Sequence, residues 1–333
     1  MLRRTFIAAS MGGLSSAATA AAATAVASAG REHAEMELHR GAALAFGTTV
    51  SVSVAHADAA QARRAIDAAL AAARRVDTLM SIYHPDSQVY RLNRDRSVQA
   101  PDPALLAVLN QARALSLLTR GAFDITVQPL WQLCNAAGPA AASTARGPAL
   151  AVVNWRMVDV SAEQVSLRKS GIGITLNGLA QGYAADLGLA ALRAHGIRHA
   201  LVDMGELAAC GAKPGAQPWT VGVADPRVDG AMAARLALGA RCLATSGDYA
   251  STFTPDMIHH HIFDPATGYS PRELASVSVL APSAMLADGL STAFMVMGAK
   301  KAHALAARME QVDLLTINKR GVVWRSPGFP VLA

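Results

Sequence analysis

An acid and an alcohol stand four residues apart near the end of the chain, in the segment ADGLSTA at residues 287–293. The pattern of apolar residues predicts one long helix over residues 283–308. On that helix Asp288 and Thr292 occupy positions i and i+4, so their side-chain oxygens face the same way. Hard cations prefer oxygen ligands, and this pair is therefore a candidate cation site.

Three consecutive histidines, His259, His260 and His261, precede the segment IFDPATG. Clustered histidines suggest zinc or copper. Neighbouring residues of an extended backbone point to opposite faces, however, so all three cannot chelate one ion. The prediction is one functional histidine and two exposed ones.

A glycine-containing turn lies in the segment TLNGLAQGYAAD, residues 175–186. A strand is expected to end here, small residues follow, and a helix begins. Such a turn exposes backbone groups and allows a diphosphate to approach closely. The glycine spacing matches neither G-x-G-x-x-G nor a P-loop, which argues against dinucleotide-binding and NTPase folds of those types. A glycine pair at a helix-packing contact would also explain the segment.

Two further segments place aromatic or acidic side chains at loop positions. The segment MSIYHPDS (residues 80–87) is a helix exit with turn-forming residues, and its Tyr83 offers a flat face to a heteroaromatic ring. The segment GAFDITV (residues 121–127) places Asp124 where a carboxylate can accept a hydrogen bond from an adenine amine or a ribose hydroxyl. Each signal is weak alone, and ordinary packing explains Tyr83 equally well.

These segments need a scaffold, and the periodicity of the chain predicts an α+β one. Strands are expected at residues 44–56, 157–160, 164–167, 200–203, 219–224 and 275–280, with a final hairpin at 312–325. Helices are expected at residues 58–80, 102–119, 179–195 and 283–308. The stretch 134–150 is rich in Ala, Gly, Ser and Pro without a period, and is expected to be a loop. No regular βαβ rhythm occurs, which favours mixed, mostly antiparallel sheets with packed helices.

The first residues have the pattern of an export signal. Arg3 and Arg4 precede a weakly apolar run that ends at Ala27-Ser28-Ala29, which resembles a signal-peptidase site. The paired arginines favour the twin-arginine route and a periplasmic location. An ordinary secretory signal and an uncleaved anchor are the alternatives. Residues 1–29 are therefore expected to be a signal peptide and residues 30–333 a single domain.

Composition excludes some classes of partner but does not decide whether the cysteines form a disulfide. The 333-residue chain has 16% charged residues and a formal net charge of +6. Because no Lys/Arg run is interleaved with aromatics, nucleic acid is not an expected partner. Cys134, Cys210 and Cys242 match no zinc spacing, and either one disulfide or three buried thiols would fit them.

Taken together, six segments resemble the FAD:protein FMN transferase (ApbE) family. They are, in order, MSIYHPDS, GAFDITVQPL, TLNGLAQGYAAD, ATSGDY, HIFDPATG and ADGLSTAF. The resemblance covers roughly residues 40–310, and the ordered set is specific although each member is weak. It implies an α+β fold with FAD in a cleft between two subdomains and Mg²⁺ at the FAD diphosphate.

The resemblance also implies roles for individual residues. The Gly178 carbonyl and the side chains of Asp288 and Thr292 match the Mg²⁺ ligands. His261 matches a histidine beside the flavin. The positions that match the FAD site are Phe46, Tyr83, Ala122, Phe123, Asp124, Thr175, Gln181, Ser246 and Ile262.

The chain departs from the family pattern at several positions. Thr175 stands where many members have Asp, which puts one FAD contact in doubt, and Asn177 stands where many have Gly. Gln181 replaces a usual Lys or Glu, and Glu206 follows Gly205 where a second Gly is common. These forms resemble the branch associated with nitrous-oxide reduction, whose client is a membrane flavoprotein.

The reaction implied is Mg²⁺-dependent transfer of FMN from FAD to a Thr or Ser hydroxyl of a client flavoprotein, with release of AMP. His261 is the candidate general base, because neutral imidazole titrates near working pH. Asp288 is the alternative, although a metal-bound carboxylate is a poorer base. Two other functions stay open: hydrolysis of FAD to FMN and AMP, and non-catalytic flavin binding in the periplasm.

Overall fold

The computed structural model describes residues 36–141 and 145–332. The predicted signal peptide, residues 1–29, lies outside the described residues. Within the described part of the chain, no helix is both long enough and apolar enough to cross a membrane. Cys134, Cys210 and Cys242 are free thiols.

The centre of the fold is an eight-stranded antiparallel sheet, whose strands run in the order β1-β2-β6-β7-β10-β11-β12-β13. Its strands are β1 (Glu37–Ala45), β2 (Thr48–His56), β6 (Ala200–Asp203), β7 (Leu207–Cys210), β10 (Cys242–Gly247), β11 (Leu274–Ala281), β12 (Asp313–Asn318) and β13 (Val323–Arg325). Every pairing between neighbours is antiparallel.

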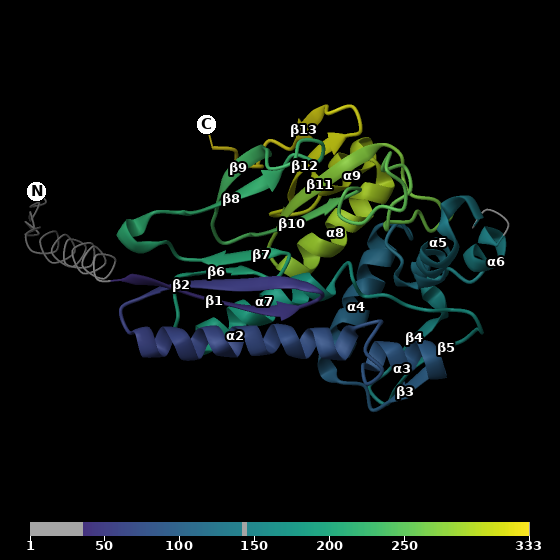
Figure 1. Cartoon of the computed structure of the whole chain (residues 1–333), viewed down its shortest axis with the longest axis horizontal. Helices are drawn as coiled ribbons and strands as arrows, with labels where there is room; N and C mark the ends of the chain where they lie inside the picture. The colour runs from purple at the N-terminus through teal and green to yellow at the C-terminus, as the bar shows by residue number, and fades with distance from the viewer. Residues whose placement is uncertain (1–35, 142–144, 333) are drawn as a thin grey trace, which may run out of the picture.

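Helices cover one face of this sheet (Figure 1). They are α2 (Ala59–Met80), α7 (Ala180–Ala194), α8 (Ala284–Met297) and α9 (Ala299–Ala306). Helix α2 packs against β1, β2 and α7, while α8 packs against α7, β10 and β11. Their apolar stripes bury most of the main core between helices and sheet.

A two-stranded ribbon covers part of the opposite face. It consists of β8 (Trp219–Ala224) and β9 (Met232–Leu238), whose inward side chains form a second core with β10, β11 and β12. Strand β11 is therefore covered on both faces, and all of its residues are buried. This explains why its sequence, LASVSVLA, contains no charged residue.

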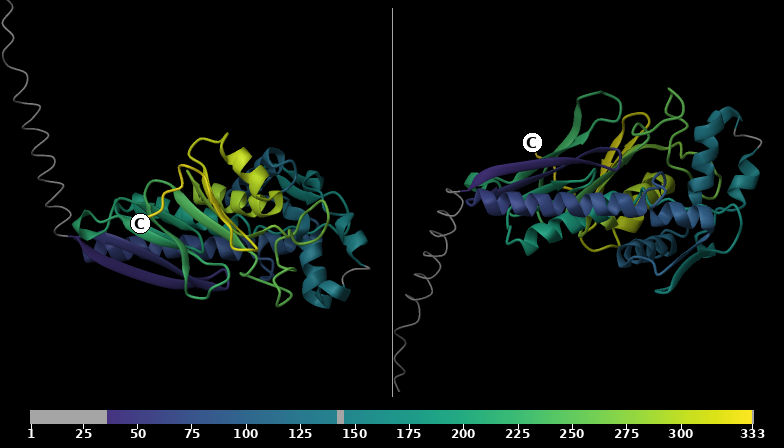
Figure 2. Two further views of the ribbon diagram at one scale, coloured as in Figure 1. Left: turned by 90° about the horizontal axis from the view of Figure 1, so that it is seen from above. Right: turned by 60° about the horizontal axis from the view of Figure 1, so that its bottom comes forward.

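The remaining elements gather beyond one end of α2, as Figures 1 and 2 show. The helices are α3 (Gln88–Asp95), α4 (Pro103–Leu118), α5 (Gln128–Ala141) and α6 (Arg146–Leu150), with 3₁₀ turns at Ile125–Val127 and Trp155–Met157. The small sheet of this region has the order β3-β5-β4 and consists of β3 (Ser97–Gln99), β4 (Val158–Val160) and β5 (Gln164–Leu167). A further 3₁₀ turn lies at Pro214–Ala216.

The α+β class and most of the predicted elements are confirmed, but three predicted segments differ in the structure. The expected strand 44–56 is a hairpin that turns at Phe46 and Gly47, which have φ of 55° and 73°. Two consecutive positive φ values are typical of a two-residue hairpin turn, yet phenylalanine rarely adopts one. The sequence therefore carried little signal for this turn.

The other two differences concern helices. The stretch 134–150, expected to be a loop, is largely helical in α5 and α6, because alanine is the best helix former and the low complexity of the stretch obscured this propensity. Residues 283–308 form two helices instead of one, because Gly298 has φ of 76° and ends α8. Glu273 then accepts a hydrogen bond from the Ala299 amide at 3.0 Å, at the start of α9.

Helices α7 and α8 approach unusually closely at Gly182. A methyl group at this position would lie 2.4 Å from the Ala284 carbonyl oxygen and 2.8 Å from the Asp288 Cβ. Asp186, one turn further along α7, accepts hydrogen bonds from the Ala284 and Met285 amides at 2.8 and 3.0 Å. The side chain of Asp186 thus caps α8 and fixes it against α7.

We expect Gly182→Ala to destabilise the protein. Alanine gains about 1 kcal/mol of helix propensity, but overpacking against backbone costs about 1–3 kcal/mol, so α8 must shift. Thermal unfolding measures the change as a lower Tm. Gly147→Ala in α6 is the control, because a methyl group there meets no atom within 4 Å; an equal Tm loss in both variants would contradict the packing argument.

Candidate functional site

The predicted cation ligands converge although they are distant in sequence. Asp288 and Thr292 lie one turn apart on α8, as predicted. A methyl group at Gly178 would be only 3.0 Å from the Thr292 Oγ1 and 3.4 Å from the Phe123 ring. The Gly182 amide donates to the Asp288 Oδ2 at 3.1 Å. The turn at residues 177–182 and α8 therefore form one site.

Strand β10 adds hydroxyl groups to this site. Ser246 Oγ lies 2.7 Å from Ser291 Oγ and 3.2 Å from Thr292 Oγ1. Ser246 was predicted from its segment, and the structure places it beside Thr292, which is predicted to be a cation ligand. Ser291 is buried and also donates to the Asp288 carbonyl at 2.8 Å.

Two buried carboxyl groups lie in the site, and burial disfavours the charged form of each. Asp288 is 4% exposed, and burial raises its pKa to about 7. Glu206, 8% exposed, accepts a hydrogen bond from the Thr245 amide at 3.2 Å. Burial and the nearby charge of Asp288 raise the pKa of Glu206 well above its usual value. Sequence reasoning noted Glu206 only as a departure from the family pattern and missed it as a site residue.

A cavity of about 320 Å³ opens beside the turn at residues 177–182. This volume falls within the roughly 300–1,000 Å³ typical of small-molecule sites. Its lining includes three of the predicted FAD residues, Phe46, Tyr83 and Gln181, together with Asn177 and Ala180. Phe46 reaches this position because the β1–β2 hairpin turns there. A larger cavity of about 690 Å³ lies along α4, β4 and β5 and contains none of the predicted site residues.

Aromatic packing connects Tyr83 to the segment that carries the histidines. The Tyr83 ring is 67% exposed and meets Trp131 of α5 edge-on, with centroids 6.2 Å apart. Trp131 packs on a small core that contains Phe253 and Phe263. Ile262, predicted to lie beside the flavin, is buried in the main core next to Phe263.

Several predicted nucleotide-binding residues have clear roles in the fold. Asp124 Oδ1 accepts from the Thr126 amide at 2.8 Å, and Oδ2 accepts from the Trp155 amide at 3.0 Å. Burial raises the pKa of Asp124 despite these bonds. Both oxygens therefore shape the loop after α4, which presents Ala122 and Phe123. Thr175 also lies here, its amide bonded to the Ile125 carbonyl at 2.8 Å.

Gln181 has a defined orientation at the start of α7. Its Nε2 donates to the Met204 carbonyl at 3.1 Å, which ties α7 to the loop between β6 and β7. Gly205 of that loop has φ of 95°, and a side chain there would collide with Gln181. Glu206 follows directly, so this contact also fixes where the second carboxylate enters the site.

His261 is held by one backbone carbonyl. Both its amide and its ring Nδ1 lie 3.0 Å from the Ser251 oxygen. Because a carbonyl only accepts, Nδ1 carries the proton and Nε2 of the neutral ring keeps its lone pair. Burial lowers the pKa of His261, so the ring is neutral at working pH. The chain from Ser246 leads directly into the loop that carries His261, but no described contact joins His261 to Asp288.

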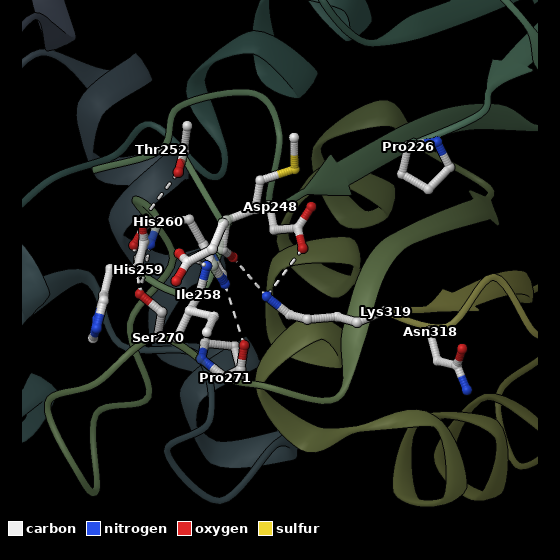
Figure 3. A network of polar contacts seen from close by, with 12 residues as sticks. Pro226, Asp248, Thr252, Ile258, His259, His260, Ser270, Pro271, Asn318 and Lys319 are labelled. Atoms are coloured by element: carbon white, nitrogen blue, oxygen red, sulfur yellow. Dashed lines mark hydrogen bonds and ion pairs between the residues drawn. The ribbon is translucent and has the colours of Figure 1, made fainter. Parts of the chain in front are cut away.

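The prediction of two exposed histidines was wrong, because His260 has no exposed surface and His259 is half-buried. The His260 amide donates to Ser270 Oγ at 2.9 Å, and its Nε2 lies 3.2 Å from the Pro271 carbonyl oxygen. Figure 3 shows the contacts of His260 with Ser270 and Pro271. The segment 259–262 lies outside the named strands, apart from one bridge between Thr252 and His260, so alternation along a strand does not apply to it.

We expect His260 to make the protein sensitive to acid. Burial lowers its pKa from 6.5 to about 4. Between these values the unfolded chain binds a proton that the folded chain does not, so stability falls as the pH drops from 6.5 to 4, by at most about 3 kcal/mol. Unfolding free energies measured across this range should vary less in His260→Gln than in wild type. His195→Gln, at an exposed position, should leave the profile unchanged.

The donor set fits a hard divalent cation. Two buried carboxyl groups and a cluster of hydroxyls suit an oxygen-preferring ion such as Mg²⁺. No group of three or more His, Cys, Asp or Glu side chains suited to a metal occurs among residues 36–141 and 145–332. A nitrogen- or sulfur-rich zinc site is thus not found there, and the oxygen-based set around Asp288 is the candidate.

Comparison with known proteins shows the family of this chain. The sequence model of the ApbE family matches residues 46–316. A protein of Vibrio cholerae named FAD:protein FMN transferase is 32% identical over 255 residues, covering 73% of this chain and 76% of the relative. A protein of the same name from Treponema pallidum is 32% identical over 302 residues, covering 83% of each chain.

Solved structures show the same fold. The ApbE protein of Thermotoga maritima superposes with a TM-score of 0.78 at 30% identity, covering 87% of this chain and 97% of that one. The flavin transferase ApbE of Vibrio cholerae superposes with a TM-score of 0.76 at 28% identity, covering 89% and 100%. With its matching sequence, fold and convergent site, this chain belongs to the ApbE family.

Proposed function

We propose that this enzyme transfers FMN from FAD to a Thr or Ser hydroxyl of a client flavoprotein, with Mg²⁺, and releases AMP. The observation that carries the proposal is the convergence of Gly178, Asp288 and Thr292 beside a cavity lined by Phe46 and Tyr83. The names of the relatives support the reaction class.

The residues present would hold the metal and the diphosphate in one place. Asp288, Thr292 and the Gly178 carbonyl are the proposed ligands, and Glu206 adds a second buried carboxylate. Bound Mg²⁺ would neutralise charge on the phosphate oxygens. The Gly182 amide, near the start of α7, donates to Asp288, and the positive end of the helix dipole favours an anionic group in this region.

Proton transfer is assigned to His261. Its Nε2 lone pair would accept the proton of the client hydroxyl. That oxygen then bonds to the FMN phosphorus, the bond from this phosphorus to the bridging oxygen breaks, and AMP leaves with the bridging oxygen. Asp288 is less suited to this step, because a carboxylate that holds a cation is a weak base.

The test combines purified enzyme with FAD, Mg²⁺ and a candidate client that carries a Thr in a small-residue motif. Flavin fluorescence that stays on the client band in a denaturing gel, and that EDTA abolishes, is the expected result. The same incubation without client distinguishes the alternatives: rapid release of FMN and AMP would indicate a diphosphatase, whereas FAD bound without turnover in either incubation would indicate a binding protein.

Export to the periplasm is part of the proposal and rests on residues 1–29 alone. The paired arginines and the Ala-Ser-Ala motif support it. Cell fractionation with sequencing of the mature N-terminus tests it. A mature chain that starts at Gly30 in the periplasm is expected, and replacing both Arg3 and Arg4 by Lys should retain the protein inside the cell.

A further inference from the structure

A buried ion cluster lies behind the loop that carries His261. Asp248 has no exposed surface, and both of its carboxylate oxygens accept from the Arg227 guanidinium, at 2.8 and 2.7 Å. Lys319 Nζ lies 3.1 Å from Asp248 Oδ2. Figure 3 shows Lys319 extending to Asp248 from the end of β12. A bidentate pair of arginine and carboxylate is a strong ion-pair geometry, and Lys319 adds a second cation to it.

The cluster joins three segments that are far apart in sequence. Asp248 follows β10, Arg227 lies in the loop between β8 and β9, and Lys319 lies in the turn between β12 and β13. The two cations also contact Met257: Lys319 donates to its carbonyl at 2.6 Å, and Arg227 Nη1 lies 3.4 Å from its sulfur. Met257 has φ of 58°, a conformation that a non-glycine residue adopts only when its surroundings enforce it.

Residues 251–261, which follow Asp248 and end at His261, form a loop that folds back on itself. The Phe253 amide donates to the His259 carbonyl at 2.8 Å, and the His261 amide donates to the Ser251 carbonyl at 3.0 Å. Met257 lies at the tip of this loop, and Asp248 lies just before its base. The ion cluster therefore holds this loop at its tip, through Met257, and just before its base, through Asp248. The contact at the base, between Ser251 and His261, orients the His261 ring.

We infer that Asp248, Arg227 and Lys319 are positioning residues for His261. This inference rests on the proposed function. The cluster touches neither the proposed cation ligands nor the cavity beside Tyr83. It is linked to His261 by the loop and by the charge of Asp248: burial lowers the pKa of the His261 ring, and this charge acts to raise it. A base must lie within hydrogen-bond reach of the proton that it takes, and a misplacement of about 1 Å can cost on the order of a hundredfold in rate.

The experiment compares Arg227→Met, Arg227→Lys and Lys319→Met with wild type. The expected result is a kcat for flavin transfer that is ~10- to 100-fold lower in Arg227→Met, with FAD affinity unchanged. Arg227→Lys keeps a cation beside Asp248 and should recover part of the rate. Amide hydrogen exchange across residues 249–262 should quicken in Arg227→Met and Lys319→Met, and this readout does not depend on activity.

Arg241→Met is the matched control. Arg241 pairs with Asp313 elsewhere on the sheet, and its side chain is 25% exposed, compared with 29% for Arg227. It should leave both kcat and exchange across 249–262 unchanged. Wild-type kcat in Arg227→Met, or a loss of kcat in Arg241→Met equal to that in Arg227→Met, would overturn the inference. If wild type transfers no flavin, the proposed function fails, while the exchange comparison still decides whether the cluster holds the loop.

Discussion

Asp288→Asn should lower flavin transfer by about a thousandfold or more. The amide keeps the shape of the side chain but removes the anionic ligand. Loss of the metal removes several kcal/mol of transition-state stabilisation, and each 1.4 kcal/mol corresponds to a factor of ten in rate. Initial rates of covalent flavin formation, measured over a Mg²⁺ titration, would show the loss.

Stability should change in the opposite direction, which separates the chemistry from folding. The folded-state pKa of Asp288 is raised to about 7 from 3.8, so without metal this group lowers stability as the pH rises from 4 to 7, and the cost stays constant above pH 7. Metal-free Asp288→Asn should therefore be at least as stable as metal-free wild type at pH 8. Asp67→Asn, an exposed position on α2, is the control. Full activity in Asp288→Asn would refute the cation assignment.

His261→Gln should lower kcat by roughly 10²- to 10⁴-fold, the range typical of a lost general base. Glutamine can keep a hydrogen bond to the Ser251 carbonyl but offers no group that titrates near neutral pH. FAD and Mg²⁺ affinity should persist, because the cation ligands lie on α8 and the 177–182 turn. Single-turnover transfer measured from pH 5 to 9 should also lose the fall in rate on the acid side, which protonation of His261 is expected to produce in wild type below about pH 6.5, because burial lowers the pKa of this ring.

His259→Gln is the matched control for this prediction. It changes a histidine of the same loop whose ring has no hydrogen bond in the described part of the chain, and we expect activity close to wild type. If His259→Gln and His261→Gln lose activity equally, the loop as a whole, not the His261 ring, would be responsible. A pH profile with an intact acid limb in His261→Gln would assign the base to another group.

Much of the site followed from local rules. The alignment of Asp288 with Thr292 depends only on helical periodicity, which relates residues four apart whatever surrounds them. Helix α2, helix α4 and strands β5, β6 and β8 follow from the spacing of apolar residues, which records the face that each element buries. The family resemblance rests on the same short segments, and the fold confirms it.

Other features depend on neighbours that are distant along the chain. The turn at Phe46 puts a phenylalanine at positive φ, which local preference opposes and which the pairing of β1 with β2 imposes. His260 lies among polar residues near a surface loop, yet its burial depends on Ser270 and Pro271 packing over it. No pattern within a few residues of either position reports such contacts.

The sequence alone determined which residue types were available for this chemistry and which of them share a helix face, because both are properties of a few adjacent residues. Only the tertiary structure brought Glu206 beside Asp288 and placed Asp248 between Arg227 and Lys319. The physical reason is that charges interact through space, and the order of strands in the sheet, not separation along the chain, sets the distances between them.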